Sequence, residues 1–326
     1  MEFSIEQLYH GILKGDRRSL ARGITLIESV HPTHRVLADQ LLDKIAPRAG
    51  NSLRIGITGV PGAGKSTFIE QFGMSAIQKG HKVAVLAVDP SSNINKGSLL
   101  GDKTRMELLS REEKAFIRPS PTSGFLGGVA NATFETMLLC EAAGYDIVLI
   151  ETVGVGQSEV MVSQMCDVFL LISLIGAGDE LQGIKKGIME MVDIIFINKV
   201  QESNLQAARK ARAELIHALQ FLRRENTWKV PVLLGSALNE KDVLNVWKSV
   251  EEFSSHKKDE GFFYEHRKRQ AEDRFEFWVN NLIIDKAKQS NALSENFDKQ
   301  RAKASSMLTN PSSQARRFVE ELFRDL

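Results

Sequence analysis

The sequence predicts an α/β fold with a doubly wound, mostly parallel sheet, and three observations carry this prediction. Short apolar runs alternate with helical segments from about residue 51 to residue 250. Continuous apolar runs with intervening helices are typical of parallel strands that crossover helices bury on both faces. The first of these runs leads into a glycine-rich loop, and a helical segment follows that loop.

Six apolar runs are expected to form the strands, and helical segments precede and follow them. Apolar residues recur with helical spacing before residue 50, where Pro32 and Pro47 interrupt the pattern. We therefore expect a helical N-terminal extension over residues 1–50, an α/β domain over residues 51–250 and a helical arm over residues 251–326. The expected strands are Leu53–Thr58, Val83–Val88, Ile147–Ile150, Val168–Ile172, Ile194–Ile197 and Val230–Leu234.

Two apolar stripes in the predicted C-terminal arm indicate self-association. A helix that cannot bury such a stripe against its own domain packs against another chain. We therefore expect a homodimer held largely by residues beyond about 255. The stripes consist of Phe275, Trp278, Val279, Leu282 and Ile283, and of Phe318, Val319, Leu322, Phe323 and Leu326.

Composition and charge exclude several classes of protein. The 326 residues carry a formal net charge of +1, so no overall field would recruit nucleic acid or a membrane surface. The two cysteines, Cys140 and Cys166, lie in apolar stretches, which argues against a disulfide scaffold and fits a reducing compartment. The first residues do not read as a secretory signal, and no run reaches the roughly 18 apolar residues of a transmembrane helix. We expect a cytoplasmic protein.

The most specific motif is a phosphate-binding loop that matches G-x-x-x-x-G-K-[ST] between a predicted strand and a predicted helix. Its glycines let successive backbone N–H groups point at phosphate oxygens, and the helix N-terminus adds a positive potential. In such a loop Lys65 would reach the β- and γ-phosphates, and the Ser66 hydroxyl would bind Mg²⁺. The motif consists of Gly59, Val60, Pro61, Gly62, Ala63, Gly64, Lys65 and Ser66, with Thr67 following it.

Acidic residues follow two further predicted strands. Asp89 ends the strand Val83–Val88, and Glu151 ends the strand Ile147–Ile150. In open α/β sheets the carboxyl ends of the strands face the crevice where ligands bind. Glu151 is soon followed by Gly154, whose backbone N–H can approach a ligand closely, so this pair resembles the element that positions Mg²⁺ and senses the γ-phosphate. Asp102, in a charged loop, fits a functional acid and a solvated acid equally well.

Three later segments are weaker signals for the same crevice. Asn198-Lys199 and Ser236-Ala237 each follow a predicted strand, where guanine-binding loops occur in GTPases. An Asn-Lys pair alone is as well explained by chance. The acids Asp179 and Glu180 are flanked by several glycines, which favours a loop near the site over an ordinary strand-to-helix turn.

Taken together, these motifs resemble the methylmalonyl-CoA mutase-associated GTPases, also called the MeaB/ArgK-like family. The resemblance runs over nearly the whole chain and is densest from Ile55 to Lys199. Two stretches are highly specific, ETVGVGQSE at Glu151–Glu159 and GAGDELQGIKKGIME at Gly176–Glu190. The resemblance implies a P-loop G domain with a helical N-terminal extension and a helical C-terminal arm used for homodimerisation.

The resemblance also implies roles for individual residues. Lys65 matches the phosphate-binding lysine of a site for GTP and GDP, and Ser66, Asp89 and Glu151 match the groups that place Mg²⁺. Asp102 resembles the switch acid close to the γ-phosphate. The segment Gly176–Gly187 resembles an additional switch that transmits the nucleotide state to a cobalamin-dependent acyl-CoA mutase, in which the family gates the loading and protection of adenosylcobalamin.

The chain departs from the family pattern at two positions. Where the family usually has Asn-Lys-Ala-Asp, this chain has Asn198-Lys199-Val200-Gln201, so the aspartate that recognises the base is missing. Lys96 also stands where the family tends to have glycine, in the loop after Asp89. Neither change touches the predicted phosphate or magnesium ligands.

Two other functions remain open beside a GTPase chaperone of a mutase. The first is a P-loop kinase or ATPase linked to amino-acid transport. The sequence shows no obvious inserted acceptor-binding domain, which argues against this function. The second is a nucleotide-binding partner protein with little turnover, which Gln201 keeps open because it would weaken base binding.

Overall fold

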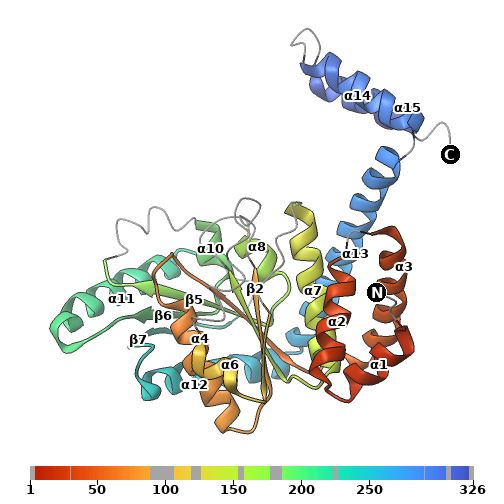
Figure 1. Cartoon of the computed structure of the whole chain (residues 1–326). Helices are drawn as coiled ribbons and strands as arrows, with labels where there is room; N and C mark the ends of the chain where they lie inside the picture. Colours follow the sequence, from red (N-terminus) through yellow and green to blue (C-terminus); the bar gives the residue numbers. More distant parts are fainter. Residues whose placement is uncertain are drawn as a thin grey trace. The chain divides into compact units, whose positions relative to one another are not determined.

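A computed structural model of the chain divides into two compact units, residues 1–264 and residues 265–326, which are treated separately below (Figure 1). The structure describes residues 4–29, 31–88, 106–118, 126–152, 158–176, 186–222, 227–289, 291–305 and 310–322.

The first unit is built on a parallel sheet of seven strands in the order β3-β2-β4-β1-β5-β6-β7. This confirms the predicted fold class. Strands β2, β4, β1, β5 and β6 are buried along almost their whole length, which is why their sequences are mainly apolar. The strands are β1 (Leu53–Thr58), β2 (Val83–Val88), β3 (Ala115–Arg118), β4 (Ile147–Thr152), β5 (Val168–Leu174), β6 (Ile194–Asn198) and β7 (Val232–Leu234).

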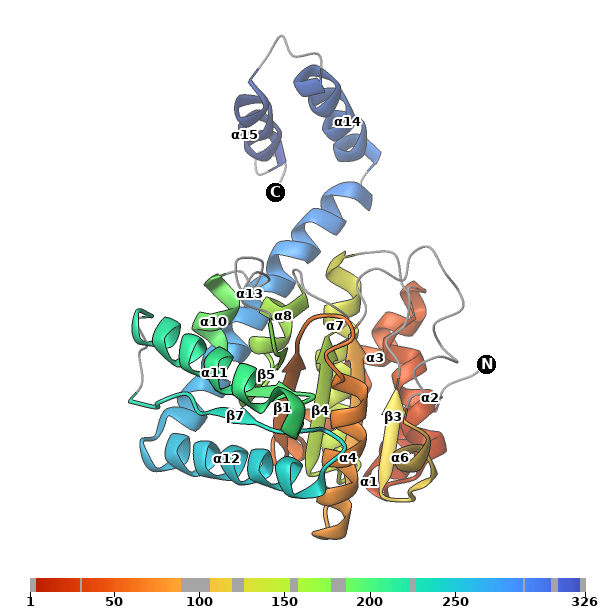
Figure 2. The same ribbon diagram turned by 90° about the vertical axis from the view of Figure 1, so that its left-hand side faces the viewer.

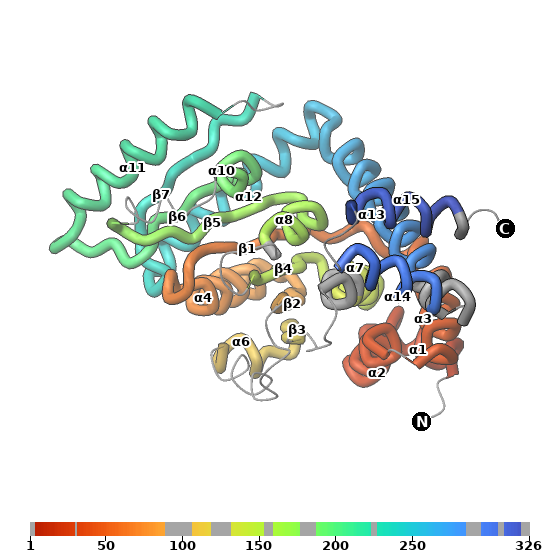
Figure 3. Tube along the Cα trace, turned by 90° about the horizontal axis from the view of Figure 1, so that it is seen from above, coloured from red at the N-terminus to blue at the C-terminus, as the bar shows by residue number. Residues whose placement is uncertain are grey.

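Helices cover both faces of the sheet. One face packs against α4 and α12, with α6 beside α4, and the other packs against α7, α8, α10 and α11 (Figure 3). The N-terminal helices α1, α2 and α3 contact one another and α7. The bounds are α1 (Ile5–Leu13), α2 (Arg17–Ile27), α3 (Pro32–Ile45), α4 (Lys65–Gln78), α6 (Glu107–Arg111), α7 (Leu126–Ala142), α8 (Ser158–Ser163), α10 (Lys186–Met191), α11 (Leu205–Gln220) and α12 (Glu240–Asp259), with short 3-10 helices η1 (Ala46–Arg48) and η2 (Glu202–Asn204).

Two details of the prediction change. The sequence does not predict strand β3, because its four residues include only three apolar ones and end in Arg118, a weak signal for an edge strand. Strand β7 begins at Val232, two residues later than the predicted start at Val230.

The helical prediction for residues 1–50 is confirmed by α1, α2 and α3. Asp16 caps α2 by accepting a hydrogen bond from the backbone N–H of Ser19 at 2.8 Å.

The second unit is helical. Helix α13 (Phe262–Gln289) begins just before the unit boundary, and α14 (Asn291–Ser305) and α15 (Pro311–Leu322) lie side by side (Figure 2). The rings of Phe297 and Phe318 join α14 to α15, with their centroids 5.3 Å apart. Among the described residues, no helix is both long enough and apolar enough to cross a membrane. The three-part division at residues 50 and 250 stays a prediction.

Candidate nucleotide-binding site

The predicted phosphate-binding loop joins the end of β1 to the start of α4. Two of its glycines are required by geometry. A Cβ on Gly59 would lie 2.1 Å from the carbonyl oxygen of Ile172 on β5, and one on Gly64 would lie 2.5 Å from Nδ2 of Asn198. Gly64 also has φ +90°, which favours glycine. The loop is therefore held closely between two neighbouring strand ends.

Lys65 is buried, with 8% of its surface exposed, and its ammonium group lies over the loop. Its Nζ donates to the carbonyl oxygens of Gly59 at 2.7 Å and Val60 at 3.3 Å. A buried ammonium that is held by backbone carbonyls is a fixed positive charge at the centre of the loop. Such a charge is what the β- and γ-phosphates of a nucleotide require.

Ser66 and Glu151 meet at the carboxyl ends of β1 and β4. The Ser66 hydroxyl donates to Oε1 of Glu151 at 3.2 Å, and Glu151 is 8% exposed. Behind them the Thr152 hydroxyl donates to that of Thr58 at 3.0 Å, which links the two strands. A hydroxyl and a carboxylate are the hard oxygen ligands that Mg²⁺ prefers, so this pair fits a magnesium ion beside the loop.

Asn198 joins three loops at the far side of the site. It is 3% exposed, and its Nδ2 donates to the carbonyl of Ala63 in the phosphate-binding loop at 2.7 Å. Its Oδ1 accepts from the backbone N–H of Lys199 at 2.8 Å and from that of Ala237 at 2.7 Å. The amide thus uses its donor and its acceptor to fix the phosphate loop relative to both predicted base loops.

Gln201 is exposed, and its side chain takes part in the turn that follows Lys199. It accepts from the backbone N–H of Asn204, whose Oδ1 in turn accepts from the N–H of Gln201 at 2.8 Å. This reciprocal pair caps η2. In the other predicted base loop, the N–H of Ser236 donates to Oδ2 of Asp242 at 2.9 Å.

The structure brings together part of the predicted site. The phosphate-binding loop, Glu151, Asn198 and the Ser236-Ala237 loop lie at one edge of the sheet, at the ends of neighbouring strands. Asp89, Asp102 and Gly154 lie outside the described residues, as do Asp179 and Glu180. Within the described ranges, no group of three or more His, Cys, Asp or Glu side chains could hold a metal ion. The predicted magnesium ligands include Asp89, which is not among the described residues.

Sequence reasoning missed Asn204 and Asp242, which hold the two predicted base loops. Asn204 could have been found from its spacing, because it follows Gln201 by three residues as in a capping box. Asp242 lies in the first turn of α12 and gave no signal beyond the usual preference for acids there.

Comparison with known proteins identifies the family. The family model described as "Methylmalonyl Co-A mutase-associated GTPase MeaB" matches residues 20–292. The chain belongs to this family. It is therefore a P-loop GTPase, in agreement with the geometry of the loop and of Asn198.

Individual relatives agree with this assignment. "GTPase ArgK" of Escherichia coli is 46% identical over 299 residues, which cover 91% of this chain and 89% of the relative. The "Methylmalonic aciduria type A homolog, mitochondrial" of Mus musculus is 47% identical over 290 residues, covering 86% of this chain and 69% of the relative. A solved structure described as a "LAO/AO transport system kinase" superposes with a TM-score of 0.79 at 36% identity and covers 99% of both chains.

Proposed function

We propose that this GTPase hydrolyses GTP to GDP and phosphate in order to gate the loading and protection of cobalamin in a methylmalonyl-CoA-type mutase. The observation that carries the proposal is the match of residues 20–292 to a family described by its association with that mutase. The mouse relative, named for methylmalonic aciduria, supports the same partner.

The proposed chemistry places each described residue in a role. Lys65 stabilises the charge on the β- and γ-phosphates, and Asn198 keeps the phosphate loop in register with the base loops. Ser66, Glu151 and, from outside the described residues, Asp89 would hold Mg²⁺. When bound, Mg²⁺ neutralises phosphate charge. Asp102 is proposed as the acid near the γ-phosphate, Gly154 as a backbone donor to it, and Gln201 with Lys199 as the neighbours of the base.

The predicted dimer is supported by the surface of α13. Phe275 is 69% exposed, Leu282 is 53% exposed, and Val279 and Ile283 are exposed beside them. An exposed apolar stripe of this kind marks a surface that binds another chain. We therefore propose that the arm forms a homodimer. We also propose a cytoplasmic location, which the free and buried thiols of Cys140 and Cys166 support.

The function is tested by measuring phosphate release with and without a cobalamin-dependent acyl-CoA mutase. We expect slow hydrolysis of GTP that the mutase accelerates, loss of hydrolysis in Lys65→Ala, and wild-type behaviour in the exposed control Lys210→Ala. Replacing Asp179 and Glu180 by alanine should reduce the stimulation more than nucleotide binding. Hydrolysis that the mutase leaves unchanged would contradict the proposal.

A second candidate, a kinase linked to amino-acid transport, is favoured by the description of the solved structure at TM-score 0.79. The kinase and the GTPase are distinguished by incubating the protein with γ-labelled GTP or ATP and candidate acceptors. Label on an acceptor would support a kinase, and label found only in free phosphate would support a GTPase. Nucleotide binding without either product would support a binding partner with little turnover.

A further inference from the structure

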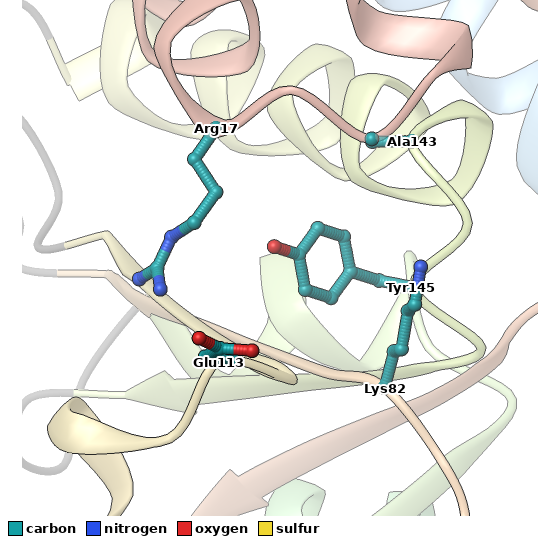
Figure 4. Close-up of a pocket in the computed structure, with 6 residues that line it drawn as sticks. Arg17, Lys82, Glu113, Ala143 and Tyr145 are labelled. Atoms are coloured by element: carbon teal, nitrogen blue, oxygen red, sulfur yellow. The ribbon is translucent and has the colours of Figure 1, made fainter.

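The two edges of the sheet differ in how their polar groups are arranged. A polar pocket of about 380 Å³ lies at the amino ends of the strands, and Arg17, Lys82 and Tyr145 are among the residues that line it (Figure 4). Arg17 and Lys82 lie on opposite sides of the Tyr145 ring, so their charges do not converge on one ligand. The carboxyl ends carry a more informative feature, which is an irregular segment where β6 ends.

This segment has one residue more than regular pairing with the chain after β7 allows. The backbone N–H of Gly235 donates to the carbonyl of Ile197 at 3.1 Å, and the carbonyl of Gly235 accepts from the N–H of Val200 at 3.0 Å. In a regular parallel ladder these two partners are two positions apart, and here they are three positions apart. Asn198 and Lys199 therefore lie opposite Gly235 as a β-bulge, a feature that is frequent beside active sites because it redirects a side chain.

Lys199 occupies the strained position of the bulge. Its φ is +62°, and no other residue with a side chain has a positive φ in the part of the chain that the structure describes. The left-handed conformation brings Cβ too close to the following carbonyl oxygen, a cost that glycine avoids. Such strain persists only where the surrounding structure imposes it, and it is concentrated at ligand sites. A lysine at this position therefore indicates a use for its side chain.

Two asparagine side chains hold Lys199 in this conformation. Oδ1 of Asn198 accepts from the N–H of Lys199 at 2.8 Å, and Nδ2 of Asn204 donates to the carbonyl of Lys199 at 3.0 Å. Oδ1 of Asn204 also accepts from the N–H of Gln201 at 2.8 Å, which fixes the turn that follows. Both backbone polar groups of Lys199 are thus bonded, one by Asn198 and the other by Asn204.

We propose that Asn204 is a positioning residue for the nucleobase and that it acts through Lys199. It keeps the exposed Lys199 side chain at the junction that Asn198 makes between the phosphate-binding loop and the Ser236-Ala237 loop. The apolar stem of a lysine packs on apolar surface while its ammonium stays in water, and the flat face of a purine ring offers such a surface. This contact does not read the edge of the base, so it adds affinity for GTP and ATP alike. The inference rests on the proposed nucleotide site and names the residue that prepares it.

The test is Asn204→Asp in the full chain, with calorimetric titration of GTP, ATP and inorganic tripolyphosphate in the presence of Mg²⁺. Aspartate keeps the acceptor for the N–H of Gln201, but it places an acceptor instead of a donor against the carbonyl of Lys199. We expect GTP and ATP to bind about threefold to tenfold more weakly, and tripolyphosphate, which has no base, to bind as before. KM for GTP should rise by the same factor with kcat unchanged. The matched control is Ser203→Ala, at the exposed neighbour of Asn204 in η2, and it should bind as the wild type does.

A double variant separates this role from a general loss of structure. Lys199→Gly adopts the left-handed conformation without strain and lacks the stem, so adding Asn204→Asp to it should weaken GTP binding no further. Equal GTP affinity in the wild type and in Asn204→Asp would overturn the inference and leave the proposed function standing. Weaker tripolyphosphate binding in Asn204→Asp, or a further loss in the double variant, would overturn it too. A wild type that binds neither GTP nor tripolyphosphate would overturn the proposed function as well.

Discussion

Replacing Gln201 by aspartate tests how this GTPase chooses its base. The resemblance to the family predicts a base-recognising aspartate at the position of Gln201, whose side chain accepts from the backbone N–H of Asn204. Aspartate is a strongly preferred cap for such a turn, so Gln201→Asp keeps the local fold. The substitution therefore changes the chemistry offered to the base without disturbing the loop.

The size of the effect follows from the hydrogen bonds at stake. A carboxylate accepts from both N1–H and the N2 amino group of guanine, whereas the glutamine amide pairs one acceptor with a donor that would face another donor. A hydrogen bond to a charged group contributes about 1.5–3 kcal/mol, which corresponds to roughly tenfold to more than a hundredfold in affinity. Gln201→Asp should raise the preference for GTP over ATP by that factor.

The assay is competition of GTP, ATP and XTP for a fluorescent nucleotide. XTP carries an oxygen where guanine has its amino group, so the wild type should accept XTP better than Gln201→Asp does. Gln206→Asp makes the same substitution on the exposed first turn of α11 and should change nothing. Tight, GTP-exclusive binding by the wild type would refute the reasoning. Loss of that exclusivity in Glu202→Gln would then identify Glu202 as the group that replaces the aspartate.

Three further predictions concern chemistry, stability and assembly. Glu151→Ala should slow hydrolysis about a hundredfold to a thousandfold in single-turnover assays, the usual cost of one well-placed electrostatic contact. Glu141→Gln should lower the free energy of unfolding by about 3–5 kcal/mol in urea titrations, since it breaks a buried pair whose Oε1 lies 2.7 Å from Nε of Arg54. Phe275→Asp should turn the dimer into a monomer in sedimentation, and a wild-type monomer would contradict the proposed interface.

The sequence predicts the buried sheet well because five of its strands are buried along almost their whole length and consist mainly of apolar residues. Parallel strands covered on both faces need that pattern, and few other structures produce it. Strand β3 lacks the pattern because it lies at the sheet edge, where Phe116 and Ile117 are its bulky apolar residues and Ile117 is only partly buried. Its pairing with β2 depends on the tertiary fold, which no local window of sequence contains.

The site can be predicted where its residues form one contiguous motif, and it cannot be predicted where the contacts join residues that are far apart in the sequence. The phosphate-binding loop is one uninterrupted stretch, so its glycines and Lys65 are evident from the sequence. Asn198 was only a weak candidate, because its partners Ala63 and Ala237 are 135 and 39 residues away.

The hydrogen bonds of the Asn198 side chain are made to the backbone, so they do not depend on which side chain stands at residue 201. The Asn198 amide donates to the carbonyl of Ala63 and accepts from the backbone N–H groups of Lys199 and Ala237, so it holds the phosphate loop against both predicted base loops. The turn around Gln201 is also held by Asn204, whose Nδ2 donates to the carbonyl of Lys199 at 3.0 Å. The two sets of contacts meet at Lys199, but only those of Asn198 reach the phosphate loop, so their consequences differ. A change at residue 201 should alter base preference alone, whereas Asn198→Ala leaves a buried carbonyl and a buried N–H unpaired and should weaken GTP and ATP binding alike.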